Sequence, residues 1–337
     1  MARAATVVIP AHGDADGLSR LLDALDSQAR HGEPLRVIVS DDGSPDPLAD
    51  AIQSSSFPAL EIELVRAEVP AGPGAARNRG LELVRTPWVA FVDGDEIPAP
   101  GWLRRLEEIA GDPDSWPAVE GAVDHGEEEA RPLAHVGTLA DGSHLSGNLA
   151  FRRDVLALVG GFDERFYDRR HGLHFREDTE LFFRLEAAGV SPRRDETLLV
   201  HHPPHPRSLG TPLRHARRYY FDPLLARLHG ERFRAFNRRR LVGPLSLRRA
   251  RHQAAVAHVL GIGLLSGGLV TGSRAATFAG LATGAAGWAA NAAALSWGRR
   301  VRARDVAPIA LVALALPWVY VVWYYRGVVR FRHLPRL

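Results

Sequence analysis

The feature that most constrains the fold is an alternation of short apolar runs with helical patterns in the first part of the chain. Strand-forming residues make up four runs, at residues 6–10, 35–40, 62–65 and 88–92. Leucines recur at helical spacing between residues 18 and 25, and a glycine-rich stretch opens a second helix that continues through Val84. Strands alternating with helices favour a mostly parallel α/β sheet, in which ligands bind beyond the carboxyl ends of the strands.

Two of these predicted strands end in pairs of acidic residues. Asp41 and Asp42 follow the second strand, and Asp93 and Asp95 follow the fourth. Carboxylates suit Mg²⁺ or Mn²⁺, which also bind substrate phosphates. Taken alone, a D-x-D motif is equally explained by a polar turn after a strand, so the rest of the chain has to decide between the two.

The stretch Gly72-Pro73-Gly74-Ala75-Ala76-Arg77 shares some features with a dinucleotide-binding loop. A nucleotide-dependent oxidoreductase is disfavoured, because Arg77 occupies the third glycine position and the motif does not follow the first strand. A glycine-rich helix start still offers backbone N–H groups to an anion. An ordinary loop that lets a helix pack closely on a strand is the alternative.

Further strands and helices are predicted up to residue 203. Residues 118–123 are expected to form a strand, and residues 145–153 a tight turn into a short strand. Asp154 is expected to cap a short helix through Val159. Glu177 and Asp178 precede a helix, where acids commonly satisfy the first N–H groups. A strand at residues 198–200 leads into two histidines, which are either metal ligands or surface residues.

Charge divides the chain at about Pro203. Residues 1–203 contain 36 Asp and Glu and 20 Arg, whereas the remainder contains three acidic residues and 22 Arg. Arginines alternate with aromatic and leucine side chains from 214 to 240, a pattern typical of segments that bind nucleic acid or lie on an anionic membrane surface. The chain has no cysteine, which excludes disulfides and thiolate metal sites.

Apolar residues dominate the C-terminal part, which favours a membrane over a nucleic acid. Spans are predicted at about 253–272, 275–296 and 306–325, and the last ends in a belt of Trp and Tyr. A soluble, alanine-rich hairpin is the alternative. The pairs Gly263/Gly267 and Gly268/Gly272 have the spacing of close helix packing.

The arginines around these spans suggest an orientation. Those before residue 253 and at 299–304 are expected on the cytoplasmic side, but three spans would place the arginines after residue 325 outside, against the positive-inside rule. A two-span or re-entrant arrangement therefore stays open. No signal peptide is evident, so the N-terminal part is expected in the cytoplasm.

In this order, the motifs resemble the inverting glycosyltransferases of family 2, of the membrane-anchored bacterial type, which have the GT-A fold. The resemblance covers about residues 5–240. Its carriers are Val7-Val8-Ile9-Pro10, Ser40-Asp41-Asp42-Gly43-Ser44, Gly72-Pro73-Gly74-Ala75-Ala76-Arg77-Asn78, Asp93-Gly94-Asp95, Gly147-Asn148-Leu149-Ala150-Phe151-Arg152-Arg153, Gly160-Gly161-Phe162-Asp163-Glu164, Arg176-Glu177-Asp178-Thr179-Glu180-Leu181 and His202-Pro203.

The resemblance implies a nucleotide-diphosphate sugar donor. The residues implied for its binding are Pro10, Ala11, Asp42, Arg77, Asp93, Gly147, Asn148 and Glu177. Pro10 and Ala11 would line the nucleotide pocket, and Asp42 would bind the base. Arg77 would lie near the base or the phosphates, and Asp93 near the nucleotide sugar or the metal, while Gly147 and Asn148 would border the sugar and the acceptor.

The resemblance also implies a metal and a catalytic base. Asp95 would hold Mg²⁺ or Mn²⁺ on the diphosphate, with His202 on the metal side and His201 as the fallback. Asp178 would be the base that deprotonates the acceptor hydroxyl, with Glu177 beside it. The segment between Asp95 and Gly147 has no acceptor signature, so the donor sugar, base and acceptor are not predicted.

Together these observations predict an α/β GT-A catalytic domain at 1–205, a basic amphipathic membrane-surface segment at 206–252 and a transmembrane region of about three helices at 253–337. The predicted function is inverting sugar transfer to a lipid-linked or cell-envelope glycan acceptor. The predicted location is the cytoplasmic membrane, multi-pass, with the catalytic domain in the cytoplasm. A catalytically inactive membrane scaffold of the same fold is the alternative.

Overall fold

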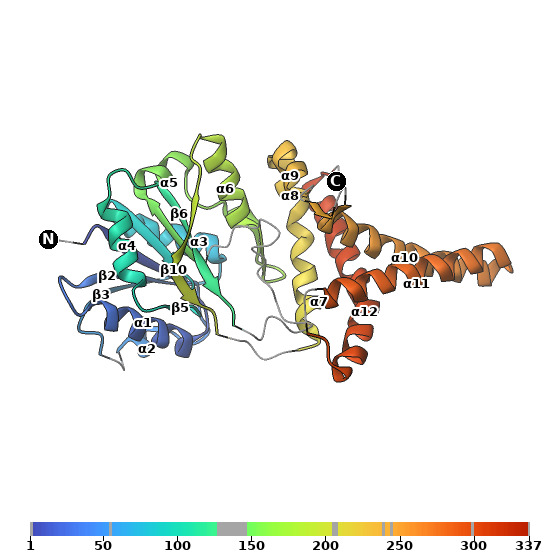
Figure 1. Ribbon diagram of the computed structural model, residues 1–337, viewed down its shortest axis with the longest axis horizontal. Helices are drawn as coiled ribbons and strands as arrows, with labels where there is room; N and C mark the ends of the chain where they lie inside the picture. The colour runs from blue at the N-terminus through green and yellow to red at the C-terminus, as the bar shows by residue number, and fades with distance from the viewer. Residues whose placement is uncertain are drawn as a thin grey trace. The chain divides into compact units, whose positions relative to one another are not determined.

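The computed structural model divides into two compact units, which are described separately. It describes residues 3–53, 56–126, 147–203, 208–237, 240–242, 245–297 and 300–335. The first unit comprises 1–126 and 143–204, and the second comprises 127–142 and 205–337 (Figure 1).

A mixed eight-stranded sheet forms the centre of the first unit, in the order β3-β2-β1-β4-β7-β6-β10-β5. Its strands are β1 (Ala5–Ala11), β2 (Leu35–Asp41), β3 (Leu60–Arg66), β4 (Trp88–Val92), β5 (Ile97–Pro98), β6 (Ala118–Asp124), β7 (Asn148–Arg152) and β10 (Arg193–His201). Strands β3, β2, β1 and β4 run parallel to one another. Strand β7 is antiparallel to both β4 and β6, and β10 is parallel to β6 and antiparallel to β5.

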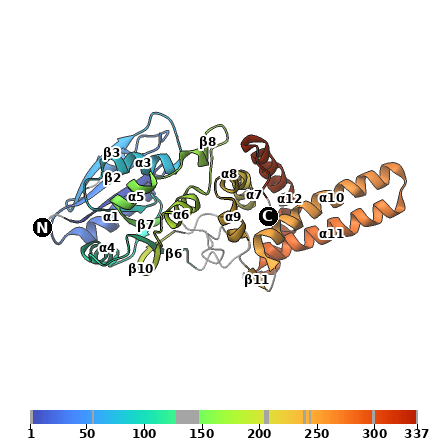
Figure 2. The same ribbon diagram turned by 90° about the horizontal axis from the view of Figure 1, so that it is seen from above.

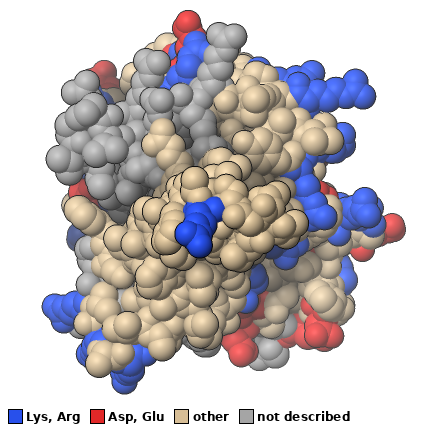
Figure 3. Space-filling view, turned by 90° about the vertical axis from the view of Figure 1, so that its right-hand side faces the viewer, with Lys and Arg blue, Asp and Glu red and all other residues tan. Residues whose placement is uncertain are grey.

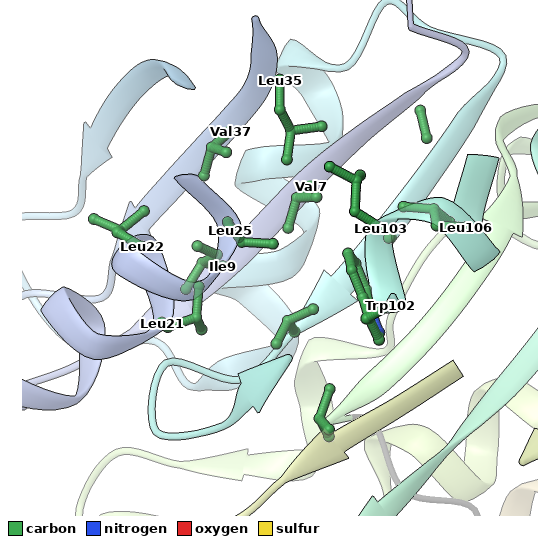
Figure 4. Close-up of a cluster of buried hydrophobic side chains, with 14 of the residues drawn as sticks. Val7, Ile9, Leu21, Leu22, Leu25, Leu35, Val37, Trp102, Leu103 and Leu106 are labelled. Atoms are coloured by element: carbon green, nitrogen blue, oxygen red, sulfur yellow. The ribbon is translucent and has the colours of Figure 1, made fainter. Parts of the chain in front are cut away.

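Helices cover both faces of this sheet (Figure 2). Helices α1 (Ala15–Ala29) and α4 (Trp102–Gly111) pack into one apolar core, shown in Figure 4. Helix α6 (Glu177–Ala187) and helix α5 (Arg153–Val159) contribute to the other core, and α3 (Pro73–Leu83) lies against β1 and β2. Because side chains alternate along a strand, Val7 and Ile9 enter the first core and Val8 enters the second. Alternation thus buries β1 on both faces.

Smaller elements complete the first unit. A short helix, α2 (Ala49–Gln53), precedes β3, and a 3₁₀ turn, η3 (Glu164–Phe166), leads into a hairpin of β8 (Tyr167–Asp168) and β9 (Leu173–His174). This hairpin brings the chain to the start of α6.

The four predicted N-terminal strands are confirmed as β1 to β4. The predicted strand at 118–123 is β6, and the short strand predicted within 145–153 is β7. Strand β10 is longer than predicted and begins at Arg193. The expected cap at Asp154 is wrong: α5 already begins at Arg153, and the Asp154 carboxylate instead accepts a hydrogen bond from Arg152 Nε at 2.7 Å.

The second unit is mostly helical. Helices α7 (Gly210–Arg217), α8 (Asp222–Leu228) and α9 (Gly230–Asn237) come first, with a 3₁₀ turn, η4 (Arg218–Phe221), between α7 and α8. A small hairpin of β11 (Arg240–Val242) and β12 (Leu245–Ser246) follows. Three long helices complete the unit: α10 (Leu247–Thr271), α11 (Arg274–Ser296) and α12 (Ala303–Phe331).

Each predicted membrane span corresponds to one of these long helices. Among the described residues, two helices are long and apolar enough to cross a membrane by length and composition, at Gln253–Thr271 and Ala303–Phe331. Helix α11 is paired with α10 in a hairpin but does not meet that test by itself.

Glycines allow α10 and α11 to pack closely, but of the four glycines that the spacing predicted, Gly268 alone lies at the contact. Gly263 and Gly267 have no heavy atom within 4 Å of the space that a methyl group would fill, so that prediction is wrong. Gly268 does contact α11, at Thr277. The closest approach is at Gly261, where a methyl group would lie 2.2 Å from the backbone nitrogen of Gly284. The spacing of glycines does not tell which face of a helix contacts its partner helix. It therefore included Gly263 and Gly267, which do not lie at the contact with α11.

Candidate active site

A buried ion cluster joins β4, α3 and α6. The Arg77 guanidinium is 1% exposed and contacts Asp93 Oδ1 at 2.5 Å, while its Nη1 lies 4.0 Å from Glu177 Oε1. Burial lowers the pKa of Arg77, but the carboxylates of Asp93, Glu177 and Asp178 outweigh that effect and raise it. Arg77 is therefore a buried cation that holds the Asp93 carboxylate in position.

The first turn of α6 carries two adjacent carboxylates with opposite pKa shifts. Burial raises the pKa of Glu177, but a hydrogen bond from His174 and the charges of His174 and Arg77 outweigh burial and lower it. Burial and the charge of Glu177 raise the pKa of Asp178 to about 6. The backbone N–H of Thr179, at 2.6 Å from Asp178 Oδ1, opposes that shift. Asp178 is thus a carboxylate that titrates close to neutral pH.

The residue before these acids has an unusual backbone. Arg176 caps α6 in the left-handed region, with φ of 80°, although it is not glycine and its side chain is 1% exposed. Its guanidinium lies 4.0 Å from the centre of the Phe175 ring. A non-glycine residue held there stores strain, and such strain is common at functional sites. No sequence motif signals a positive φ at an arginine.

Asp95 and His202 face each other across the ends of β4 and β10. Asp95 Oδ2 lies 3.6 Å from His202 Nε2, whereas His202 Nδ1 lies 3.0 Å from the carbonyl of Pro203. If Nδ1–H donates to that carbonyl, Nε2 presents a lone pair to a carboxylate, an arrangement that a cation between them would stabilise. His201 instead pairs with Asp124 at 3.1 Å. The two histidines, either of which the sequence offered as a metal ligand, therefore have different carboxylate partners.

A third histidine lies beside this pair, and sequence reasoning missed it. The ring centres of His125 and His202 are 5.3 Å apart, because the parallel strands β6 and β10 end together. Burial and the neighbouring His202 lower the pKa of His125 to about 4. Among the described residues, no three His, Asp or Glu side chains gather closely enough to hold a metal by themselves.

Asp42 lies at the end of β2 and accepts hydrogen bonds from the loop before α3. The backbone N–H groups of Ala71 and Gly72 reach its carboxylate at 3.0 and 2.7 Å, and Arg79 Nη2 reaches it at 3.3 Å. The glycine-rich helix start does bind an anion, but the anion is the chain's own carboxylate. The Tyr167 ring covers Gly72 so closely that a methyl group there would lie 2.7 Å from it.

The Asn148 side chain makes its hydrogen bonds within the sheet. Its Nδ2 donates to the carbonyls of Ala122 and Leu198 at 2.9 and 2.6 Å, and its Oδ1 accepts from Trp102 Nε1 at 3.0 Å. The amide is 1% exposed. The expected role of Asn148 beside the sugar stays a prediction, and these contacts give the side chain a structural role as well. A motif match gives the position of such a residue but not the direction of its side chain.

Gly147 lies against a buried acid that sequence reasoning did not single out. A methyl group at Gly147 would lie 2.3 Å from the Glu96 carboxylate, which is 4% exposed. Burial and the charges of Asp93 and Asp95 raise the pKa of Glu96 well above its usual range. Glu96 supports the D-G-D turn through its backbone N–H, which donates to the Asp93 carbonyl at 3.0 Å, and the third carboxylate in that motif was the available signal.

Pro10 and Ala11 end β1 beside the same turn. A methyl group at Gly94 would lie 3.3 Å from the Pro10 carbonyl and 3.5 Å from the Ala11 side chain. The structure therefore brings the ends of β1, β4 and β10 and the start of α6 to one edge of the sheet, as the parallel order predicted.

The sequence and the fold are both similar to those of known proteins. Residues 6–171 match Glycosyl transferase family 2. The pre-mycofactocin glycosyltransferase of Mycobacterium tuberculosis is 34% identical over 222 residues, which cover 59% of this chain and 43% of that protein. The succinoglycan biosynthesis protein ExoU of Rhizobium meliloti is 27% identical over 200 residues, covering 55% and 57%. The chain thus spans only about half the length of these curated relatives.

A solved structure shares the fold. The mannosyltransferase PcManGT from Pyrobaculum calidifontis, solved in complex with GDP-Man and Mn²⁺, has a TM-score of 0.51 and 21% identity, covering 97% of this chain and 85% of that chain. The sheet order, the D-G-D turn and the acids of α6 agree with the sequence match. Residues 6–171 therefore form a domain of glycosyl transferase family 2 with a GT-A-like fold.

Proposed function

We propose that this chain transfers a sugar from a nucleotide-diphosphate sugar to an acceptor hydroxyl in one inverting displacement. The observation that carries the proposal is Asp178, on the first turn of α6, with a pKa raised to about 6. A general base works best when its pKa lies near the operating pH, since it is then ionised and still accepts a proton readily. Asp178 takes the proton of the acceptor hydroxyl as that oxygen attacks the anomeric carbon and the nucleoside diphosphate leaves.

The nucleotide lies, in this proposal, against the ends of β1 and β2. Pro10 and Ala11 line the pocket with apolar surface. Asp42 shapes it indirectly, because its carboxylate fixes the backbone of Ala71 and Gly72. The guanidinium of Arg77 is buried, so it acts on the donor through Asp93 rather than by direct contact with the phosphates.

The donor sugar lies near Asp93, Gly147 and Glu177. The absence of a side chain at Gly147 leaves room for Glu96, which keeps the D-G-D turn in place. Glu177 stays ionised beside Arg77 and raises the pKa of its neighbour Asp178. These groups orient the sugar and set the protonation of the base.

A divalent cation fits between Asp95 and His202. Carboxylate oxygen and imidazole nitrogen both ligate Mn²⁺, and Mg²⁺ accepts the carboxylate together with phosphate oxygens. Two protein ligands leave the remaining positions for the donor's diphosphate, which agrees with the lack of a three-residue cluster among the described residues. When bound, Mg²⁺ or Mn²⁺ neutralises the charge that develops on the leaving diphosphate. PcManGT, a neighbour in fold, was solved with Mn²⁺.

The acceptor in this proposal is a lipid-linked or cell-envelope glycan at the cytoplasmic face of the membrane. Two helices long and apolar enough to cross a bilayer support membrane attachment. ExoU, a relative in sequence, is a succinoglycan biosynthesis protein. An inactive scaffold is disfavoured, because such a protein has no need of a strained helix start that holds a carboxylate with a pKa of about 6.

The test uses membranes that contain the full chain, a panel of nucleotide-diphosphate sugars, and Mg²⁺ or Mn²⁺. We expect one donor to release its nucleoside diphosphate only with metal present, and the extracted lipids to gain one sugar mass. Asp95→Asn and His202→Ala should lose metal-dependent nucleotide binding, whereas His201→Ala is the matched control because His201 pairs with Asp124. The absence of metal-dependent binding for every nucleotide sugar would refute the proposal.

A further inference from the structure

Helix α12 packs its inner face on the segment α7–η4–α8 within the second unit. The rings of Tyr219 and Tyr320 lie 4.7 Å apart, and those of Tyr220 and Phe331 lie 5.2 Å apart. Gly327 lies so close to Tyr220 that a methyl group there would be 2.1 Å from its carbonyl oxygen. These contacts extend along the C-terminal half of α12 as far as its last residue.

The partner segment carries charge that cannot enter the hydrocarbon of a bilayer. Arg217 stacks over Trp323 at 4.6 Å, and Arg227 donates to the Phe331 carbonyl at 3.0 Å. Arg326, on α12 itself, also lies over the Trp323 ring, at 5.0 Å from the ring centre. An arginine is costly at the centre of a membrane. The C-terminal half of α12 therefore lies where arginines reach water.

The remaining part of α12 is too short to cross a membrane. Between Asp305 and Tyr320 it offers Val306–Val319, which is about 21 Å long at about 1.5 Å per residue. A bilayer core is about 30 Å thick. The mean hydropathy of α12 reaches 2.1 and suggests a span, but that value takes no account of the arginine-bearing segment packed along the helix.

The outer face of α12 is an exposed apolar stripe. Its residues recur every three to five positions along the helix, and they include Leu311, Leu314, Trp318, Val322, Tyr325 and Val329. A helix with polar or packed residues on one side and an apolar stripe on the other lies in the plane of a membrane interface. The stripe thus has one suitable occupant, the acyl-chain boundary of a phospholipid leaflet.

The α10–α11 hairpin is built differently. It projects from the rest of the second unit in both ribbon views, and α12 crosses its base, where Trp288 Nε1 donates to the Ala310 carbonyl at 3.1 Å (Figures 1 and 2). Seen end-on, the tip presents uncharged surface around one blue side chain (Figure 3). Arg274, exposed at the turn, is the hairpin's one Lys, Arg, Asp or Glu from Gln253 to Trp297.

The length of the hairpin matches a bilayer. Gln253–Thr271 is about 28 Å long at about 1.5 Å per residue, so a fully inserted hairpin brings Arg274 to the far headgroups. Insertion only part of the way would leave Arg274 in hydrocarbon. The backbone contact between Gly261 and Gly284 joins α11, which is less apolar, to α10 so that the two cross together.

We infer that the chain crosses the membrane only twice, as the α10–α11 hairpin, and that α12 lies in the interface on the same side as the family 2 domain. This inference rests on the membrane attachment in the proposed function and specifies its topology. It also resolves the sequence conflict over the positive-inside rule, because the arginines after residue 325 return to the side of those at 299–304. The prediction of three spans is thereby replaced.

The chain contains no cysteine, so single cysteines report the side of the membrane without background. Three exposed positions are suitable: Ala275 at the hairpin tip, Leu334 after α12 and Leu158 in the family 2 domain. Each full-length variant is treated with a membrane-impermeant maleimide, in intact cells and in inverted membrane vesicles. We expect Ala275→Cys to be labelled in intact cells, and Leu334→Cys and Leu158→Cys to be labelled only in inverted vesicles.

Each other result overturns the inference in a different way. Labelling of Leu334→Cys in intact cells would mean that α12 spans the membrane. Protection of Ala275→Cys in intact cells would mean that the hairpin does not cross. If the chain does not sediment with membranes at all, membrane attachment itself is wrong. Loss of sugar transfer leaves these labelling patterns unchanged, so failure of the proposed reaction is distinguishable from failure of the topology.

Discussion

Helices α3 and α6 both begin at the edge of the sheet where the candidate site lies. The two helices differ in where the acidic residues at their first turn come from. Before α3, the N–H groups of Ala71 and Gly72 donate to Asp42, a carboxylate supplied by β2. At α6, the helix carries its own acids, Glu177 and Asp178, in the first turn. Before α3 the acid comes from a neighbouring strand and accepts backbone hydrogen bonds, whereas at α6 the acids belong to the helix itself.

The difference shows how to separate structural from chemical carboxylates. Asp42 accepts from two backbone N–H groups and from Arg79, and is 5% exposed. Asp178 accepts hydrogen bonds from the backbone N–H and the hydroxyl of Thr179 at one oxygen, Oδ1, while burial and Glu177 raise its pKa to about 6. An acid whose charge the fold satisfies fixes geometry, whereas an acid whose charge the fold disfavours is ready to accept a proton.

The largest expected effect is on turnover, at α6. Asp178→Asn removes the base but keeps the shape and the hydrogen bond from Thr179, so kcat should fall roughly 10²–10⁴-fold while nucleotide binding is kept. Release of nucleoside diphosphate and nucleotide titration measure the two quantities. Asp154→Asn is the matched control, since Asp154 lies in the first turn of α5, where its exposed carboxylate pairs with Arg152. An equal loss in both variants would mean that Asp178 has no special role.

The next effect is on stability, at α3. Asp42→Asn replaces a carboxylate that accepts charge-assisted and backbone hydrogen bonds, so the unfolding free energy should fall by about 2 kcal/mol. Thermal unfolding of the full chain, followed by tryptophan fluorescence, should show a Tm lower by roughly 4–8 °C. Asp46→Asn, at an exposed position of the same loop, should leave Tm unchanged. If Asp42→Asn lowers turnover without lowering Tm, Asp42 contacts the substrate instead of holding the loop.

The sheet was largely predictable from the sequence because its strands are buried on both faces. Runs such as Trp88–Val92 have no alternative placement, and the order of parallel strands then brings their carboxyl ends together. Asp93 and Asp95 were singled out at such a strand end and Asp178 at the start of a helix, and the family resemblance implied their roles. Strand β10 was predicted too short because its first half, from Arg193, is polar and exposed.

What the sequence left undetermined was the direction of side chains and the pairing of helices. Asn148 stands in a family motif, yet its amide turns into the sheet. The Arg77 side chain is buried and paired with Asp93, and the sequence around Arg77 does not indicate this burial. The topology of the second unit depends on the contact between α12 and the segment around Tyr220, which is about a hundred residues away in sequence. Hydropathy alone takes no account of that contact, so it predicts one span more than the two that we infer.

An effect of similar size concerns the free energy of unfolding that the natural chain loses at neutral pH through Asp178. The folded pKa of Asp178, about 6, lies above its ordinary value of 3.8, so the folded state binds the proton more tightly than the unfolded state does between these values. As pH rises through this window, the folded protein loses stability. Asp178→Asn avoids this loss and should be more stable than the natural chain at pH 7.5, by on the order of 2 kcal/mol.

Thermal unfolding at two pH values checks this sign. The Tm of Asp178→Asn should exceed that of the natural chain at pH 7.5, by roughly 4–8 °C, and the difference should shrink by pH 5. The Asp154→Asn control should show no such dependence. A variant that is less stable at pH 7.5 would indicate that Asp178 is held by favourable contacts, like Asp42, and the contrast between the two helix starts would disappear.

The smallest effect tests how the start of α6 sets the pKa of its base. The guanidinium of Arg176 is one of the charges that lower the pKa of Asp178, against burial and Glu177. Arg176→Gln keeps most of the side chain but removes the charge, so the pKa seen in the pH dependence of kcat should rise by roughly half a unit to one unit. Activity would then fall at pH 6 and recover at pH 8.

Arg165→Gln is the control. It removes an arginine that pairs with Asp163 and should leave the pH dependence of kcat unchanged. A profile unchanged in Arg176→Gln, with kcat lowered at every pH, would instead assign Arg176 to the geometry of the helix start, through its positive φ.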